Sequence, residues 1–255
     1  KTKQRRLQSN LMKLKIANKT EFVNRFLNQL SKINTACVLK VTGTGITSLL
    51  TAADNTLILF SRYNTKFDID RDINLNIPDL NRLSKMIQCI PGEDITLDVY
   101  DSVIKYESKD VRFQYYLLDD GIIETPPLSE EKIKAIEYNT NFELAYESLV
   151  GLIKSSSFVV DIHKVYFYTK DGSIYAEVND KKRQNIDNIC LKLADKYNGD
   201  QITTPLPMSL ETIRLLGSAR TDKIAVLINN KLNVMMFGIN NNDIKLTYIV
   251  SGLVK

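Results

Sequence analysis

Histidine, cysteine and long apolar runs are all scarce in this chain of 255 residues. The single histidine, His163, excludes a histidine-rich metal site and a Ser-His-Asp triad. The three cysteines, Cys37, Cys89 and Cys190, lack CxxC spacing, which indicates small core residues in a reducing compartment and no disulfide or metal framework. No apolar run approaches the roughly 18 residues that span a bilayer, and no secretory signal is visible, so we expect no integral membrane protein.

Motifs that bind cofactors are absent as well. The Gly43-Thr44-Gly45 segment lacks the third glycine and the following helix of a dinucleotide fingerprint, and no Walker-type GxxxxGK[ST] occurs. Asp68, Asp70 and Asp72 alternate, but they lack the glycine and the terminal glutamate of a calcium loop. We therefore expect no active site, no metal and no cofactor.

What the chain does contain is a repeated layout. Each half has a proline-led amphipathic segment followed by three runs with a β pattern. The two prolines, Pro78 and Pro207, and two strand onsets, Ile95 and Ile224, are each 129 positions apart (207 − 78 and 224 − 95). An offset that holds across a helix, a loop and a strand indicates duplication of a domain-sized unit.

Apolar periodicity predicts two helices and a series of short strands in each half, an α+β unit. The helices are expected at residues 19–33 (capped by Thr20 or Asn18), 79–90, 142–155 and 208–218. The strands are expected at 35–41, 45–52, 56–63, 69–77, 95–100, 103–107 and 111–118, and then at 135–140, 158–162, 165–169, 173–178, 186–193, 202–206, 223–229, 232–238 and 244–250.

Residues 119–137 interrupt this pattern. Gly121, two consecutive prolines and a group of acidic residues predict an extended linker with an apolar centre. We therefore expect one domain at residues 12–118 and another at 138–255. Residues 1–11 are expected to form a basic tail: residues 1–15 contain six lysines and arginines and no acid, within a chain of net charge +4. Such a tail is attracted to polyanions, or simply adds solubility.

This order of elements resembles the DNA sliding clamps of the proliferating cell nuclear antigen and T-even phage polymerase accessory clamp type. The resemblance covers residues 12–250 and depends on the proline-led second helices, the strand triplet after each of them, and the connector at 119–137. In that family two copies of a two-helix, nine-stranded domain are joined by an extended connector, and three chains close a ring around duplex DNA.

The resemblance implies a homotrimer that is not an enzyme, needs no cofactor, and tethers a DNA polymerase to its template. An ATP-dependent clamp loader would open the ring. The protein would act inside the cell at replicating DNA, in the host cytoplasm or nucleoid if it is a phage protein and in the nucleus if it is eukaryotic. The size and the Asn/Ile/Lys-rich composition are typical of a viral protein.

A sliding clamp needs cations directed at phosphates and no side chains that read base edges. The outward helix faces supply such cations, although a solvated helix face is the alternative for each one alone. The predicted DNA-binding residues are Lys19, Arg25, Lys32, Arg82, Lys85, Lys154, Arg214 and Arg220, with loop residues Lys181, Lys182 and Arg183 as additions. Glu143 and Glu147 are expected on the polar side of the helix at 142–155, which makes that helix a poor phosphate binder.

By the same resemblance, client proteins insert a short peptide into an apolar pocket beside the connector. The predicted partner-binding residues are Ile122, Ile123, Pro126, Pro127, Leu128, Tyr248, Val250 and Leu253. The alternative is that these residues pin the connector to its own domain. Ring closure would pair edge strands at residues 111–118 and 173–178 of neighbouring chains.

Two other functions are compatible with the same fold. One is a herpesvirus-type processivity subunit that binds DNA as a monomer through a basic face, and the basic tail favours it. The other is a clamp-like late transcription coactivator that recruits RNA polymerase. An enzyme of unrecognised type is disfavoured because no active site is found.

Overall fold

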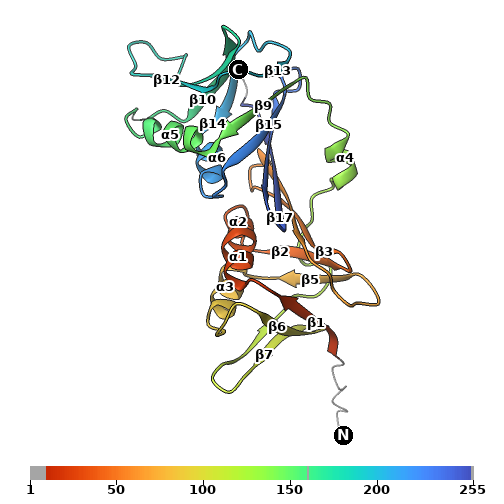
Figure 1. Cartoon of the computed structure of the whole chain (residues 1–255). Coiled ribbons are helices and arrows are strands. Elements are labelled where there is room, and N and C mark those ends of the chain that lie inside the picture. The colour runs from red at the N-terminus through yellow and green to blue at the C-terminus, as the bar shows by residue number, and fades with distance from the viewer. Residues whose placement is uncertain (1–9, 160, 254–255) are drawn as a thin grey trace, which may run out of the picture. The chain divides into compact units, whose positions relative to one another are not determined.

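The computed structural model describes residues 10–159 and 161–253 of the chain (Figure 1). The chain divides into two compact units, one formed by Lys1–Leu50 and Ser61–Pro126 and the other by Thr51–Phe60 and Pro127–Lys255. The predicted basic tail lies outside the described residues, except for its last two positions, which begin the first strand. Within the described ranges no helix has both the length and the apolar character needed to cross a bilayer.

The first unit contains two groups of antiparallel strands. One is the sheet β1-β6-β7-β8, and in the other β2 lies between β3 and β5. The bounds are β1 (Asn10–Ile16), β2 (Cys37–Thr42), β3 (Gly45–Thr51), β5 (Ile73–Ile77), β6 (Ile95–Tyr100), β7 (Val103–Glu107) and β8 (Arg112–Tyr116). Strand β4 (Leu57–Asn64) is divided, because residues 57–60 cluster with the second unit and residues 61–64 with the first.

Strand β1 corrects the prediction of a tail that extends to residue 11. Met12, Leu14 and Ile16 are buried, and the lysines between them are exposed, which is the two-residue alternation of a half-buried strand. Lys13 lies 3.6 Å from the carboxylate of Asp98 on β6. Two of the six cations in residues 1–15, Lys13 and Lys15, therefore lie on a sheet.

Two helical segments pack together in the first unit (Figure 1). The predicted helix at 19–33 is observed as α1 (Lys19–Glu21), a π-helical stretch η1 (Phe22–Leu27) and α2 (Asn28–Ser31). The wider π turns bury Phe22, Val23, Phe26 and Leu27 together. The second helix, predicted at 79–90, is α3 (Leu80–Gln88).

The second unit also contains two antiparallel sheets. Their strand orders are β12-β11-β10-β14 and β13-β9-β15-β16-β17. The bounds are β9 (Thr140–Ala145), β10 (Lys164–Lys170), β11 (Ser173–Val178), β12 (Ile189–Ala194), β13 (Asn198–Gly199), β14 (Leu206–Ser209), β15 (Lys223–Asn229), β16 (Val234–Asn241) and β17 (Ile244–Ser251). The helices are α4 (Glu130–Lys134), α5 (Tyr146–Ser156) and α6 (Leu210–Leu216).

The first elements of the second unit differ from the prediction. The connector is not extended throughout, because Ser129 caps the short helix α4 by accepting a hydrogen bond from the Lys132 backbone N–H at 3.3 Å. Residues 140–145 form strand β9, where the predictions had a strand at 135–140 and a helix from 142. In β9, Phe142 and Leu144 are buried while their neighbours are exposed, and the strand pairs with β15 over six positions. Strand pairing therefore overrides the helical pattern of this segment.

Three further predictions in the second unit are corrected. Residues 158, 159, 161 and 162 form no strand, and Asp161 has a positive φ of 61°. The strand predicted at 202–206 lies instead at Leu206–Ser209, so Pro207 belongs to β14 and does not begin the helix, which starts at Leu210 after the N-cap residue Ser209.

The two units nevertheless share one order of elements, so the predicted duplication is confirmed. The sheet β1-β6-β7-β8 corresponds to β9-β15-β16-β17, the group β5-β2-β3 to β14-β10-β11, and α3 to α6. Ile95 begins β6, and Ile224 is the second residue of β15. The offset found in the sequence thus marks equivalent positions of the repeat.

Candidate nucleic-acid interface

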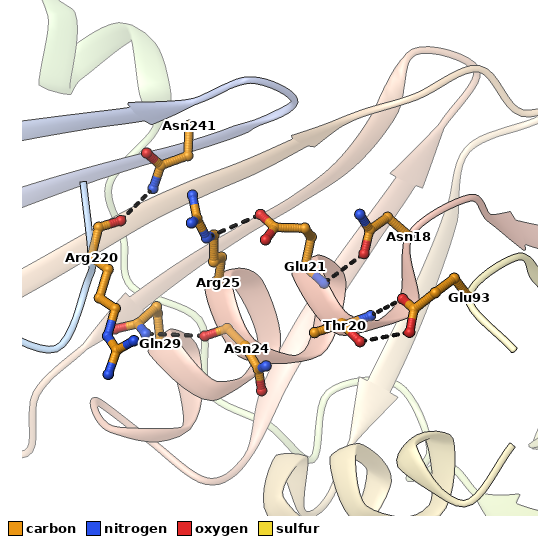
Figure 2. Close-up of polar contacts among 9 residues, drawn as sticks. All are labelled: Asn18, Thr20, Glu21, Asn24, Arg25, Gln29, Glu93, Arg220 and Asn241. Carbon is orange, nitrogen blue, oxygen red and sulfur yellow. Dashed lines mark hydrogen bonds and ion pairs between the residues drawn. The ribbon is translucent and has the colours of Figure 1, made fainter. Parts of the chain in front are cut away.

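The first helical segment of the first unit is held at its start by side chains (Figure 2). The Asn18 side-chain oxygen accepts a hydrogen bond from the Glu21 backbone N–H at 2.9 Å. The Glu93 carboxylate, in the loop before β6, accepts from the Thr20 backbone N–H at 2.9 Å and from its hydroxyl at 2.8 Å. These two bonds lower the pKa of Glu93. The helix is thereby tied to the loop that follows α3.

Two of the predicted DNA-binding cations on this segment, Lys19 and Arg25, already make contacts within the first unit. The Lys19 ammonium donates a hydrogen bond to the Ile90 carbonyl, just after the end of α3. The Arg25 guanidinium lies 3.0 Å from the Glu21 carboxylate, one turn earlier (Figure 2). Lys19 therefore joins the two helical segments, and the charge of Arg25 is largely balanced within its own helix.

The buried residue Tyr115 of β8 positions helix α3. Its hydroxyl accepts a hydrogen bond from the Asp79 backbone N–H at 2.9 Å and donates one to the Asp79 carbonyl at 2.7 Å. Asp79 is the N-cap residue of α3, and its carboxylate accepts from the Arg82 backbone N–H at 3.0 Å. The Arg82 guanidinium lies over the Tyr115 ring, 5.2 Å from its centroid. Burial raises the pKa of Tyr115, so the phenol stays neutral.

Three of the predicted DNA-binding cations of the first unit remain available to an anion. Lys32, Arg82 and Lys85 are exposed, and none of them has a carboxylate partner among the described residues. Arg82 and Lys85 lie on the solvent side of α3, whose opposite side, including Leu83 and Ile87, is buried. Helix α3 therefore presents two unbalanced positive charges on a rigid element.

The helices of the second unit are less positive. On α6, the Arg214 guanidinium lies 3.5 Å from the Glu211 carboxylate, and another of its nitrogens donates to the Ser156 hydroxyl of α5 at 3.4 Å. Glu143, predicted on a helix, instead lies on β9 and pairs with Lys223 at 2.8 Å.

Of the DNA-binding residues predicted in the second unit, Lys154 and Arg220 are exposed and have no carboxylate partner among the described residues. Lys154 lies in the last turn of α5, and Arg220 follows α6, where its carbonyl accepts from the Asn241 side chain at 3.0 Å (Figure 2). The balanced arginines carry a sequence signal that the prediction overlooked, because Glu21–Arg25 and Glu211–Arg214 have the four- and three-residue spacing of helical ion pairs.

The predicted partner-binding residues of the connector are accessible to different degrees. Ile122 is 64% exposed, and Pro127 is exposed as well. Ile123, Pro126 and Leu128 are half-buried. The start of the connector is fixed to β5 by backbone and side-chain bonds of Asn76, which reach Leu118 and the Asp120 carboxylate.

The C-terminal candidates separate into core and surface residues. Tyr248 and Val250 are 1% and 0% exposed, so both lie in the core of the second unit and offer no surface to a peptide. Leu253 is half-buried, and its backbone N–H donates to the Pro207 carbonyl at 2.8 Å.

Leu232 is a surface residue that the sequence analysis overlooked. It is 64% exposed in the turn between β15 and β16, and the Asn229 side chain shapes that turn by accepting from its backbone N–H at 2.8 Å. The next residue, Asn233, accepts from the Gly252 backbone N–H at 2.6 Å, which brings this turn beside Leu253. Leu232 and Leu253 therefore lie on neighbouring segments of the second unit.

Each unit has an outer strand that could pair with another chain. β8 is the last strand of its sheet, and its residue Tyr116 is 64% exposed. The hydrogen bonds from Ser108 to Val111 and from Leu117 to Ser102 show that the odd-numbered residues bond to β7. The backbone N–H of Gln114, an even-numbered residue, therefore points to the open edge.

In the second unit the open edge is β12 and not the predicted strand at 173–178. Strand β11 (Ser173–Val178) pairs with β10 on one side and with β12 on the other. The outer strand β12 was predicted at residues 186–193, but its place at the edge depends on pairings between distant segments.

Comparison with solved structures shows the fold. A structure described as the C-terminal region of FEN-1 bound to A. fulgidus PCNA matches with a TM-score of 0.78 at 13% identity, over 96% of this chain and 99% of that one. The proliferating cellular nuclear antigen of Entamoeba histolytica matches with a TM-score of 0.77 at 14% identity, over 96% and 100%. No protein-family model matches the chain, and no curated protein matches it in sequence. The predicted α+β fold, with two tandem copies of the processivity-clamp domain, is confirmed.

Proposed function

We propose that this protein is a sliding clamp: a non-enzymatic processivity factor that encircles duplex DNA and tethers the replicative polymerase. The observation that supports it most is the duplicated clamp domain with unbalanced cations on α3. The clamp likeness supports a general role in processive DNA replication. Domains at 12–118 and 138–255, joined by the connector at 119–137, would form each third of a homotrimeric ring.

The proposed DNA contacts are electrostatic and independent of sequence. Arg82 and Lys85 are the principal phosphate ligands, and Lys32, Lys154 and Arg220 are the secondary ones, because these five are exposed and have no carboxylate partner among the described residues. Lys19, Arg25 and Arg214 are assigned to structural contacts instead. A small number of phosphate contacts keeps binding weak and dependent on salt, which lets a ring slide.

Ring closure is proposed to pair β8 of one chain with β12 of the next. Both are outer strands of four-stranded sheets, and pairing would satisfy backbone groups that are otherwise open. A head-to-tail contact of this kind generates a closed ring when the rotation between chains closes. An ATP-dependent loader would open one such contact.

The topological link can be tested with linear duplex DNA that carries biotin at both ends. The protein is allowed to thread onto the DNA, streptavidin then blocks the ends, and the complex is washed at about 1 M salt, where the Debye length is about 3 Å. We expect the protein to stay on the blocked DNA and to leave when a restriction enzyme cuts the duplex. Release by salt alone from blocked DNA would instead support the monomeric, herpesvirus-type mode of binding.

The polymerase is proposed to dock on two exposed apolar residues, Ile122 of the connector and Leu232 in the turn between β15 and β16. Single variants Ile122→Asp and Leu232→Asp should each reduce capture of the replicative DNA polymerase about tenfold, because a buried charge replaces an apolar contact. Thr203→Asp, at an exposed site of the second unit, is the matched control. Capture of RNA polymerase in place of DNA polymerase would favour the late transcription coactivator.

The place of action follows from this function. A clamp of this kind works at replicating DNA inside the cell, and the composition favours a viral origin.

A further inference from the structure

A basic hollow of about 260 Å³ lies on the second unit. Strand β10 forms one wall of this hollow. Its residues Val165 and Phe167 point into the core, so Lys164 and Tyr166 point to the opposite face of the sheet. Pro207 of β14 pairs with Tyr166 and therefore lies on the same face. We name this hollow the Tyr166 pocket.

The Tyr166 pocket has an apolar floor and a positive rim. The Tyr166 ring and two prolines, Pro205 and Pro207, form the floor, and Lys164, Lys181 and Lys182 surround it. The Lys181 ammonium lies 4.6 Å from the centre of the Tyr166 ring.

The charge of one rim lysine is partly balanced by a carboxylate, and the charges of the other two are not. The Lys181 ammonium lies 3.9 Å from the Glu177 carboxylate, which also accepts from the Asn179 side chain at 2.7 Å. Lys164 and Lys182 have no carboxylate within ion-pair distance among the described residues. The pocket therefore offers an anion two unbalanced ammonium groups.

The turn that bears these lysines is held in place before any ligand binds. The Asp180 carboxylate accepts from the Lys182 backbone N–H at 3.2 Å, and the Asp180 carbonyl accepts from the Arg183 backbone N–H at 2.9 Å. The Asn179 backbone N–H donates to the Lys164 carbonyl at 3.4 Å, which joins the turn to β10. Such preorganisation reduces the entropy lost when a ligand binds.

We propose that the Tyr166 pocket binds an acidic peptide segment of a partner protein. An apolar side chain of the peptide would lie against Pro205, the accessible part of the floor, and carboxylates on either side of it would contact Lys164 and Lys182. Nucleic acid fits less well, because Tyr166 is only 8% exposed beneath Lys181 and so offers no ring face on which a base could stack. The pocket contains none of the five proposed phosphate ligands, so this inference does not depend on the proposed clamp function.

The test uses the full chain and a fluorescein-labelled peptide in which a leucine and a phenylalanine are flanked on both sides by aspartates. Fluorescence polarisation at low salt should give saturable binding, and a peptide with lysines in place of the aspartates should not bind. The double variant Lys164→Glu with Lys182→Glu should bind the acidic peptide at least about tenfold more weakly, since two attractive charge pairs become repulsive. Lys170→Glu with Lys245→Glu, two exposed lysines outside the pocket, is the matched control and should bind within about twofold of the unaltered chain.

Three results would overturn the proposal. The unaltered chain gives no saturable binding of the acidic peptide, or the pocket variant and the control variant bind it equally. A single-stranded oligothymidylate that displaces the peptide and loses affinity in the pocket variant alone would assign the pocket to nucleic acid. Thermal unfolding of both double variants shows that any loss of binding is not a loss of fold.

Discussion

The variant Gln114→Pro is expected to behave in solution as a single chain of 29.1 kDa, whereas the unaltered protein is expected to form the proposed trimer. The backbone N–H of Gln114 points to the open edge of β8, so proline removes a donor that the partner strand needs and leaves the bonds to β7 in place. The lost backbone hydrogen bond and the steric conflict of the proline side chain with the partner strand together cost about 3 kcal/mol at each interface between chains. That is roughly a hundredfold in each association constant.

Light scattering combined with size-exclusion chromatography measures this change in mass. Gln114→Ala is the matched control, because it removes the same side chain and keeps the N–H, and it should remain trimeric. Circular dichroism confirms that the proline variant is folded. A proline variant that keeps the trimer mass would show that β8 is not the closing edge, and an unaltered protein that is already a single chain would remove the ring from the proposed function.

The double variant Arg82→Glu with Lys85→Glu should bind duplex DNA about 10- to 100-fold more weakly and should lose most of its stimulation of processive synthesis. Each phosphate contact adds about 0.9 to the slope of log affinity against log salt, so the slope should fall by about 2. Both residues lie on the exposed side of α3 and have no carboxylate partner among the described residues, so their replacement disturbs no ion pair there.

The matched control reverses two exposed cations of the same unit that lie outside its helices. Lys66→Glu with Arg71→Glu changes the net charge by the same amount and should leave DNA binding within about twofold. The mass of the assembled protein in solution should stay unchanged in both double variants. Equal losses in the two would show that overall charge, and not the face of α3, determines DNA binding.

Local signals explain which elements were predictable from the sequence. Helix α3 is found within two residues of its prediction because Asp79 at its start and Pro91-Gly92 after its end are local signals of helix termini. Strands β6 and β11 match their predicted bounds because their apolar residues alternate between clear turns, and β7 matches because turns bound it on both sides. Strand β9 was missed, since Phe142 and Leu144 fit either a strand or a helix and only pairing with β15 separates the two.

The sequence predicted the type of the candidate site, a cationic surface on helices, but not all of the residues that form it. A search for exposed cations on duplicated helices finds Arg82 and Lys85 correctly as exposed residues. It overlooks that Arg25 and Arg214 are balanced by glutamates one turn away, unless ion-pair spacing is also considered. The prediction of partner-binding residues includes Tyr248, which is buried, because an apolar residue of a strand has the same sequence pattern in a core and in a binding surface.

The sequence by itself determined that the chain is a duplicated α+β protein with a cationic second helix in its first half, because repeats, caps and turns are properties of neighbouring residues. The tertiary structure alone decided which strands are left at sheet edges and which apolar residues reach the surface. Those outcomes depend on contacts between residues far apart in the chain, such as Tyr115 with Asp79 and β12 with β11, and no local pattern encodes them.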